Sequence, residues 1–357
     1  MKSKLFLHCL ALFLLTLPSV VYGALTQIEQ LGKIMYQDKN FSRNKTQSCQ
    51  TCHHHVSGFA DPTNMRDPYF TVVSLGDNGT SLGGRNAPTS SYCGFSPPLQ
   101  QKDDGTYVGG MFWDGRATGS SENLQDPLAE QAQGPPLNPD EMDMESVEAL
   151  VDIVRNSSYS SLFKKVFGPT SLVDPDAAFD NIARAIAAYE RSAEVQQFSS
   201  RYDTNQLTEQ ETRGFDLVKL NCITCHALEF DDQDPDTLPP PAALFTNYTY
   251  ANIGVPANPL LEGNPIDLGL GGILLDPTEN GKFKVPTLRN LAISAPYSHN
   301  GYFPTLEDIV RFKSTRDLLP WDAPEVDENL SFDIGSFNFS AEEINDIVTF
   351  LNALTDK

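Results

Sequence analysis

Beyond its first two dozen residues, the sequence has no apolar run long enough to cross a membrane. The early run, residues 5–15, follows Lys2 and Lys4 and leads to the small residue Gly23. A basic start, a short apolar run and small residues before a cleavage point are typical of a secretory signal. We therefore expect residues 1–23 to be removed and the mature chain to reside in the periplasm, an oxidising compartment, without spanning a membrane. An uncleaved membrane anchor is the alternative.

Basic residues are scarce. The 357 residues include 25 Lys and Arg against 47 Asp and Glu, which gives a formal net charge of -22 at pH 7. So acidic a surface is repelled by phosphate groups, which argues against nucleic acid or an anionic membrane as the partner. The charge permits steering of a basic protein partner, but many exported proteins are acidic. Charge alone therefore does not identify a partner.

Cysteine is scarce too, and no pair is left for an internal disulfide. Cys9 lies in the expected signal, Cys93 stands alone, and the other four lie in Cys49-Gln50-Thr51-Cys52-His53 and Cys222-Ile223-Thr224-Cys225-His226. Both segments have the pattern C-x-x-C-H, the attachment signature of a c-type haem. Each cysteine can add across one haem vinyl group, and the histidine can ligate the iron. The sequence therefore predicts two covalent haem groups and leaves Cys93 as a buried small apolar residue.

A C-x-x-C pair also occurs in thioredoxin-like redox sites and in zinc sites. A zinc ribbon built from both pairs would space them far more closely than these two segments are spaced. A thioredoxin-like pair needs a βαβ setting, which the sequence around the segments does not provide. Because both segments carry the histidine and the chain has an export signal, we favour haem.

Helical periodicity and capping residues predict a mostly helical chain. The expected helices are residues 25–36, 144–155 and 177–191, a helix from the capping box Thr208/Glu211 to the second haem segment, a short helix from Thr305 through Lys313, and a last helix from the capping box Ser340/Glu343. Glycine, proline, asparagine and aspartate dominate residues 57–110, and proline and glycine dominate residues 231–281. We expect both of these stretches to be mostly loop.

Each half of the chain thus runs from a helix through a C-x-x-C-H segment into loops and then further helices. This is the plan of a small cytochrome c domain. The expected fold class is all-α with long loops, in two cytochrome c-like domains that each hold one covalent c-type haem. We expect an N-terminal domain at residues 24–195, a C-terminal domain at residues 205–357, and a linker at residues 195–207.

Six short stretches occur in a recognisable order and together span most of the mature chain. They are residues 48–53 (Ser-Cys-Gln-Thr-Cys-His), 85–89 (Arg-Asn-Ala-Pro-Thr), 112–116 (Phe-Trp-Asp-Gly-Arg), 130–135 (Glu-Gln-Ala-Gln-Gly-Pro), 283–290 (Phe-Lys-Val-Pro-Thr-Leu-Arg-Asn) and 295–301 (Ala-Pro-Tyr-Ser-His-Asn-Gly). In this order the sequence resembles the bacterial di-haem cytochrome c peroxidase family, which includes the MauG-type enzymes. Each stretch is weakly specific alone, whereas six in order are strongly specific.

The resemblance implies that peroxide reacts at the N-terminal haem and that the C-terminal haem takes electrons from a donor. By motif, His53 resembles the proximal ligand of the peroxidatic haem, and Gln131 and Glu141 match the family's distal pair. Cleavage of a bound peroxide requires a proton moved from its inner to its outer oxygen, and a carboxylate can shuttle that proton while an amide holds the peroxide. Trp113 matches the tryptophan between the two haems, where an indole can relay electrons.

The resemblance also implies a structural calcium ion between the domains. Asn86 matches the side-chain ligand, and Ser294 and Pro296 match the residues whose backbone carbonyls bind the ion. Oxygen ligands suit this hard cation. We therefore expect a calcium site at these three residues.

Histidine is absent from one place where many peroxidases of the family have it. Those enzymes put a histidine on the distal face of the oxidised peroxidatic haem, in the stretch that corresponds to residues 74–78, here Ser-Leu-Gly-Asp-Asn. The histidines of the mature chain are His53, His54, His55, His226 and His299. Our hypothesis is that the first haem is five-coordinate or water-ligated at rest. Peroxide could then react without prior reduction, as in MauG-type enzymes.

Methionine is absent after Met144, so the C-terminal domain cannot supply the methionine that peroxidases use as the sixth ligand of the second haem. MauG-type members use a tyrosine there, and the matching position here is Lys313. A lysine amine can ligate iron only when deprotonated, which needs burial and a lowered pKa. The alternative is that Lys313 points to solvent and the ligand is missing or comes from elsewhere, and the sequence does not choose. Either way we expect a lower haem potential than in a His/Met enzyme.

Three functions stay open. The resemblance favours a periplasmic oxidoreductase that reduces hydrogen peroxide to water with electrons from a small redox protein, a cytochrome c or a cupredoxin. The missing distal histidine and methionine favour instead a MauG-like oxidase that acts on tryptophan or tyrosine of a partner protein. The third is a non-enzymatic two-haem electron carrier, and the matches at Gln131 and Glu141 argue against it. Members of the family are often homodimers, which the sequence neither requires nor excludes.

Overall fold

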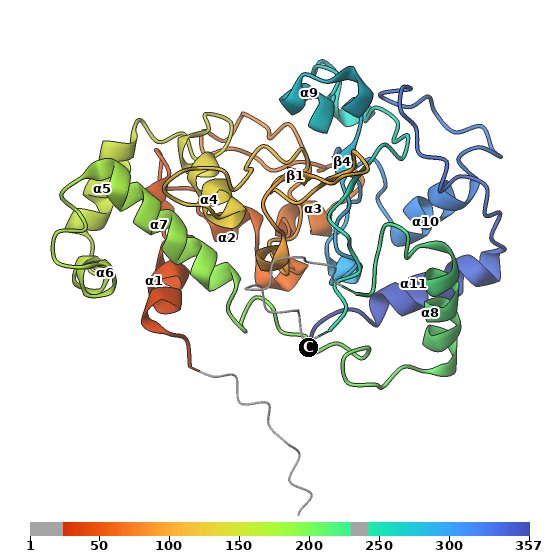
Figure 1. Cartoon of the computed structure of the whole chain (residues 1–357), viewed down its shortest axis with the longest axis horizontal. Coiled ribbons are helices and arrows are strands. Elements are labelled where there is room, and N and C mark those ends of the chain that lie inside the picture. Colours follow the sequence, from red (N-terminus) through yellow and green to blue (C-terminus); the bar gives the residue numbers. More distant parts are fainter. Residues whose placement is uncertain (1–23, 230–241) are drawn as a thin grey trace, which may run out of the picture.

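The computed structural model describes residues 24–229 and 242–357. The expected signal at residues 1–23, with Cys9, lies outside the described residues. Within the described part of the chain, no helix is both long enough and apolar enough to cross a membrane. The chain folds into two lobes that lie side by side, with the C-terminus between them (Figure 1).

Helices dominate the structure, and the strands of the described residues form two short antiparallel pairs. The α-helices are α1 (Gln27–Tyr36), α2 (Cys49–Cys52), α3 (Pro62–Arg66), α4 (Pro127–Leu137), α5 (Val147–Asn156), α6 (Ser160–Phe167), α7 (Pro175–Glu190), α8 (Glu209–Asn221), α9 (Leu270–Leu274), α10 (Leu306–Thr315) and α11 (Ala341–Asn352). Strand β1 (Gln100–Gln101) pairs with β2 (Tyr107–Val108), and β3 (Tyr250–Ala251) pairs with β4 (Phe283–Lys284). The expected all-α fold with long loops is confirmed.

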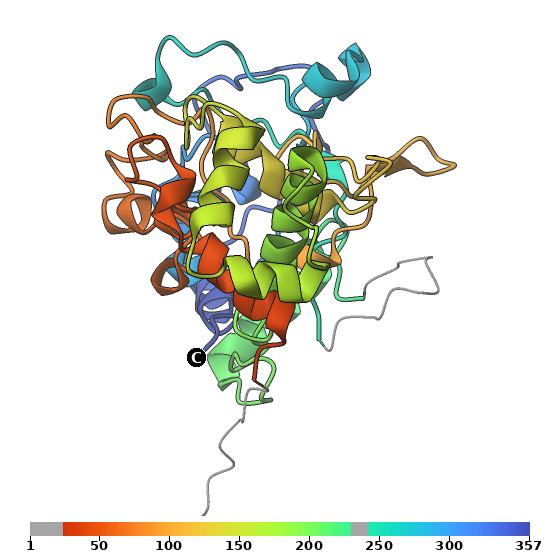
Figure 2. The same cartoon turned by 90° about the vertical axis from the view of Figure 1, so that its left-hand side faces the viewer.

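The first lobe is built on a close crossing of α1 and α7, and Figure 2 turns this lobe toward the viewer. A Cβ at Gly32 of α1 would lie 1.8 Å from the carbonyl oxygen of Ala185 and 3.0 Å from the Cβ of Tyr189. Only a residue without a side chain allows the two backbones to approach so closely. Around the crossing lies a core of buried side chains that includes Leu31, Met35, Leu128, Leu150, Val154, Phe163, Ile182 and Ile186.

The second lobe repeats this crossing with α8 and α11. A Cβ at Gly214 of α8 would lie 2.0 Å from the carbonyl oxygen of Asp346 and 2.8 Å from the Cβ of Phe350. In both lobes, therefore, a glycine faces a carbonyl and the aromatic residue four positions further on. A second, separate core forms here, with Val218, Phe245, Phe312, Ile347, Phe350 and Leu354 among its members. Two cores agree with two domains, and the boundaries at residues 195 and 205 stay a prediction.

The predicted helices are all present, with ends that differ by a few residues. Thr208 and Ser340 cap α8 and α11, and each forms the expected capping box with the glutamate three residues on. Five α-helices of the described residues were not predicted: α2, α3, α4, α6 and α9. Helix α4 contains three prolines at its ends and has no single apolar face, whereas α9 is five residues long and includes two glycines. Their formation depends on tertiary contacts more than on local pattern.

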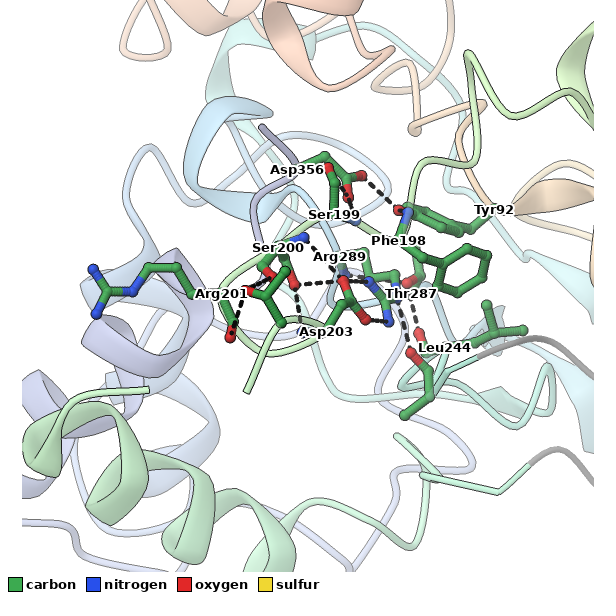
Figure 3. A network of polar contacts seen from close by, with 12 residues as sticks. Tyr92, Phe198, Ser199, Ser200, Arg201, Asp203, Leu244, Thr287, Arg289 and Asp356 are labelled. Atoms are coloured by element: carbon green, nitrogen blue, oxygen red, sulfur yellow. Dashed lines mark hydrogen bonds and ion pairs between the residues drawn. The ribbon is translucent and has the colours of Figure 1, made fainter. Parts of the chain in front are cut away.

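Arg289 is buried where the linker, both lobes and the C-terminus meet (Figure 3). Its guanidinium donates to both carboxylate oxygens of Asp203, at 2.9 and 2.8 Å. The same group lies 4.9 Å from the ring centre of Tyr92 and 4.6 Å from that of Phe198. The Tyr92 hydroxyl in turn donates to Asp356 at 2.5 Å. A buried charge without a partner strongly destabilises the folded state, so Arg289 keeps its contact with Asp203. This ion pair therefore holds the linker in one position against both lobes.

Replacing Gly214 by alanine should destabilise the second lobe. The new methyl group would lie 2.0 Å from the Asp346 carbonyl oxygen, so α8 and α11 must separate. We expect the free energy of unfolding to fall by about 1–3 kcal/mol from overpacking, partly offset by about 1 kcal/mol of helix propensity. Thermal unfolding of the holoprotein, followed by circular dichroism, measures this. Gly84→Ala is the matched control, because a Cβ there meets no atom within 4 Å. An equal midpoint for both variants would contradict the prediction.

Candidate functional site

The first C-x-x-C-H segment forms α2, a single helical turn that ends at His53. The backbone N–H of His53 donates to the carbonyl of Cys49 at 2.9 Å, and its imidazole Nδ1 lies 3.2 Å from the carbonyl oxygen of Phe59. A carbonyl can only accept, so Nδ1 carries the proton and Nε2 keeps its lone pair. This hydrogen bond orients the ring as a metal-binding histidine requires.

The second segment has the same geometry. The backbone N–H of His226 donates to the Cys222 carbonyl at 2.9 Å, and its Nδ1 lies 2.9 Å from the Phe245 carbonyl oxygen. Burial lowers the pKa of His226 to about 3, and burial also lowers the pKa of His53. Both imidazoles are therefore neutral at physiological pH, which is the form that binds iron.

A threonine anchors the peptide group just before each phenylalanine whose carbonyl accepts from the histidine. Phe59 and Phe245 both have positive φ (61° and 55°), which is unfavourable for a bulky residue. The Thr89 hydroxyl donates at 2.6 Å to the carbonyl just before Phe59, and the Thr287 hydroxyl donates at 2.6 Å to the carbonyl just before Phe245. We call each set of histidine, phenylalanine and threonine a proximal frame.

The sequence interpretation missed the proximal frames. The sequence does contain a signal for the proximal frames. Each threonine directly follows a proline, Pro88 or Pro286, in one of the six stretches of the resemblance. The contact joins residues about thirty or more positions apart, however, so no local pattern predicts it.

The residues present fit a covalently attached haem in each lobe. Cys49, Cys52, Cys222 and Cys225 are all free thiols, and each pair stands next to a histidine with an available Nε2. The second pair lines a mostly apolar cavity of about 260 Å³ together with His226. Among the described residues, no three His, Cys, Asp or Glu side chains converge as a metal site.

Glu141 lies close to the first haem segment. Residues 138–144 fold back on the end of α4, and Asn138 donates through its side chain to Glu141 Oε1 at 2.7 Å. Burial raises the pKa of both Cys49 and Cys52 most, followed by the charge of Glu190 for Cys49 and of Asp61 for Cys52; the charge of Glu141 adds a smaller increase to both pKa values. Burial raises the pKa of Glu141 itself above the ordinary value of 4.5. A carboxyl group with a raised pKa is a stronger base than an ordinary glutamate and can both take up and release a proton.

Gln131 lies on α4, the helix onto whose end the Glu141 segment folds back. Its side chain is half-buried, and its amide makes no hydrogen bond with any described residue. Both the amide oxygen and the amide nitrogen therefore stay available for a ligand.

The stretch at residues 74–78 packs against Glu141 and contains no histidine. The backbone N–H of Asp77 donates to the Glu141 carbonyl at 2.7 Å. The Asp77 carboxylate accepts from the backbone N–H groups of Asn44 and Thr46 and from the Thr46 hydroxyl. Ser74 donates to Asp61 at 2.6 Å. The stretch is thus anchored along its length beside the first haem segment.

Trp113 lies between the lobes. Its indole N–H donates to the backbone carbonyl of Asn86 at 2.9 Å, and its own carbonyl accepts from the backbone N–H of Lys284 at 2.8 Å. Nearby, Arg85 of the first lobe forms a two-pronged ion pair with Asp267 of the second, at 2.6 and 2.7 Å. Trp113 therefore contacts both sides of the junction, through its indole on one side and its backbone carbonyl on the other.

The three residues expected to bind calcium line one cavity. Asn86, Ser294 and Pro296 all contribute to the wall of the cavity that also contains the second haem segment. The Asn86 amide nitrogen donates to the Val72 carbonyl at 2.9 Å, so the amide oxygen points the other way. Oxygen atoms of this kind suit calcium.

Lys313 lies on α10 and faces the second haem site. Its side chain lines the cavity together with His226, and its amine has no hydrogen-bond or ion-pair partner among the described residues. Burial lowers the pKa of the Lys313 amine. The other lysine of this cavity, Lys284, is half-buried and donates instead to the Gly110 carbonyl at 2.9 Å. Lys313 is likewise half-buried and borders the cavity of the second haem segment, and iron ligation by its amine stays a prediction.

Comparisons with known proteins agree with this geometry. A family model described as di-haem cytochrome c peroxidase matches residues 26–212. The chain is 36% identical to methylamine utilization protein MauG of Paracoccus denitrificans, over 92% of this chain and 88% of that protein. It is 29% identical to cytochrome c551 peroxidase of Nitrosomonas europaea, over 91% and 79%. The fold is similar to the diheme peroxidase BthA of Burkholderia thailandensis, with a TM-score of 0.78, 28% identity, and coverage of 94% and 87% of the two chains.

Replacing Thr287 by valine should raise the reduction potential of the second haem, and Thr89→Val that of the first. Each variant loses the hydroxyl-to-carbonyl hydrogen bond of one proximal frame. A looser contact at Nδ1 makes the imidazole a weaker donor to iron, and we expect shifts on the order of tens of millivolts. Spectroelectrochemical titration of the holoprotein resolves the two haems, so each variant is the control for the other. Equal shifts of both haems in either variant would contradict a local effect.

Proposed function

Because the chain belongs to the di-haem cytochrome c peroxidase family, we propose that it is a periplasmic peroxidase that reduces hydrogen peroxide to water with electrons from a cytochrome c or a cupredoxin. The observation that carries this proposal is the position of Glu141. It is a half-buried carboxyl group with a raised pKa, held by the Asn138 side chain on a segment that packs against residues 74–78 beside the first haem segment. The haem groups supply the redox chemistry when bound.

In this proposal the residues of the first lobe bind and protonate the peroxide. His53 would hold the iron through Nε2. The Gln131 amide would hold the peroxide by hydrogen bonds. Glu141 takes the proton from the inner oxygen and delivers it to the outer oxygen, so that the O–O bond breaks with loss of water. Two electrons and two further protons complete the reduction of one peroxide to two waters.

The second lobe supplies the electrons. His226 would hold the second iron through Nε2, and Lys313 would be a further ligand, since it lines the same cavity and its amine has no other partner among the described residues. Trp113 carries electrons between the lobes from its position at the junction. Calcium at Asn86, Ser294 and Pro296 would hold this junction together.

The second candidate is a MauG-like oxidase that acts on tryptophan or tyrosine of a partner protein. Two observations favour it: the anchored stretch at residues 74–78 offers no distal histidine, and the second lobe offers Lys313 where peroxidases have methionine. Peroxide added to the fully oxidised holoprotein, followed by a reduced c-type cytochrome, separates the two. Rapid multiple turnover supports the peroxidase. A long-lived oxidised spectrum with little turnover supports the oxidase.

Replacing Glu141 by glutamine should slow peroxide consumption by about 10²–10⁴-fold, because the variant has no carboxylate to move the proton. The wild-type rate should fall as the pH falls through the raised pKa of Glu141, since protonation removes the active carboxylate. This fall of the rate, the acidic limb of the pH–rate profile, should lie above pH 4.5. The residual activity of the variant should not show it. Stopped-flow measurement over a pH series gives both results.

Glu145→Gln is the matched control for this experiment. Glu145 is a nearby glutamate on the surface, paired with Arg43 at 3.0 Å. Its replacement should leave both the rate and the acidic limb unchanged. Equal haem content in all three proteins, measured as the pyridine haemochrome, excludes a loss of cofactor. Full activity of Glu141→Gln would contradict the assigned role.

Replacing Lys313 by alanine should convert the oxidised second haem from low-spin to high-spin, because the variant loses a nitrogen ligand. Lys313→Met should restore a six-coordinate haem with a higher potential, since a thioether favours the reduced iron. EPR spectroscopy and potentiometry measure these changes. Lys282→Ala is the control, because it removes a lysine of the same lobe that pairs with Glu279. An unchanged EPR spectrum in Lys313→Ala would contradict iron ligation by this residue.

A further inference from the structure

Two tyrosines pack against each other beside the first haem segment. Tyr36 is the last residue of α1, and Tyr189 lies one residue before the end of α7. Their ring centres are 5.2 Å apart, with the ring planes at 64°. The close crossing of α1 and α7 brings the two rings together, since Tyr189 also contacts the Gly32 position. The pair therefore has a rigid geometry.

The inner member of the pair contacts the peptide of the first proximal histidine. Tyr36 is buried, and its hydroxyl donates to the backbone carbonyl of His53 at 3.0 Å. The same hydroxyl lies 2.9 Å from Ser90 Oγ. From the imidazole of His53, a path of covalent bonds and one hydrogen bond thus reaches the ring of Tyr36, and one ring contact continues it to Tyr189.

The outer member of the pair borders a cavity at the protein surface. Tyr189 lines a cavity of about 400 Å³ together with Tyr36, Gln50 and His55. Lys33 and Glu194 close the cavity with an ion pair at 2.5 Å, and both side chains are 36% exposed. The Tyr189 hydroxyl makes no hydrogen bond with the described residues. A phenylalanine would therefore pack equally well at this position, and the hydroxyl is free to release its proton into the cavity.

We propose that Tyr36 and Tyr189 form a redox relay through which Tyr189 reduces the first haem site after peroxide has oxidised it. The relay rests on the proposed peroxide reaction in the first lobe. It differs from the Trp113 route, which leads to the second lobe, because it ends at a surface cavity. It discharges oxidising equivalents from the first lobe when the second lobe supplies no electrons.

The relay step is balanced in electrons and protons. Tyr189 loses one electron, which passes through the Tyr36 ring and the His53 peptide to the oxidised haem site. The O–H bond of Tyr189 breaks, and its proton goes to solvent water in the cavity. Burial raises the pKa of Tyr189 to about 12, so the phenol holds this proton until the electron leaves. A one-electron reductant from solution, such as a phenol or ascorbate, then returns an electron, and a proton from water restores the O–H bond.

The test is freeze-quench EPR on the fully oxidised holoprotein after one equivalent of hydrogen peroxide. We expect an organic radical signal that narrows in protein made with ring-deuterated tyrosine. Tyr189→Phe should lose this signal, and the peroxide-oxidised haem spectrum should decay at least several-fold more slowly in stopped-flow measurements. Tyr189 is the preferred position for the substitution, since its hydroxyl makes no hydrogen bond with residues 24–229 or 242–357 that the fold would lose.

Tyr159→Phe is the matched control. Tyr159 is also buried in the first lobe, but its hydroxyl donates to Asp38 at 2.5 Å, away from the proximal frame. This variant should keep the radical and the wild-type decay. The same radical and the same decay in Tyr189→Phe would overturn the relay.

A photochemical experiment separates failure of the relay from failure of the proposed function. A holoprotein that does not react with peroxide would overturn the peroxide reaction. In that case, flash oxidation of the haem by a ruthenium complex with a sacrificial quencher supplies the oxidant instead. A tyrosyl radical that depends on Tyr189 would then support the relay. Haem oxidation without such a radical would overturn it.

Discussion

The hydrogen bond from a proximal imidazole to a backbone carbonyl is the constraint on which both lobes depend. His53 and His226 present Nε2 to an iron only while Nδ1 is held, and the accepting carbonyl belongs each time to a phenylalanine with positive φ. A bulky residue does not adopt that conformation unless its surroundings enforce it. The threonine of each proximal frame provides the enforcing contact. The loops therefore determine the ligand geometry, and the helix crossings hold the loops in place.

Buried ion pairs hold the two lobes against each other. Arg289 pairs with Asp203 of the linker, and Arg85 of the first lobe pairs with Asp267 of the second. Arginine binds a carboxylate through two parallel hydrogen bonds, so it sets an orientation as well as a distance. Since an unpaired charge in these places would be strongly destabilising, the lobes keep one arrangement. The position of Trp113 between them follows from that arrangement.

The sequence predicted the parts of the molecule that depend on local signals. The capping boxes at Thr208 and Ser340 involve residues three positions apart, and each C-x-x-C-H segment is five residues long, so both could be recognised directly. Helix α4 was not predicted because proline normally indicates a helix boundary or a loop, and this helix contains three prolines. The proximal frames could not be recognised from the sequence because they result from contacts between distant residues. Family resemblance, not pattern, pointed to Glu141 and Lys313, and their roles stay predictions, although Lys313 does border the cavity of the second haem segment.

The two lobes match in detail, although their sequences differ. Both have a glycine against a helix carbonyl, and both have a threonine hydroxyl on the carbonyl before the acceptor of the histidine. Two separate origins would not be expected to arrive at the same two contacts. The chain is therefore best explained as a tandem duplication of a single-haem ancestor. The lobes differ elsewhere, since Glu141 belongs to one and Lys313, on the wall of the cavity of the second haem segment, belongs to the other. Specialisation of the duplicate could thus proceed without any change to the inherited frame.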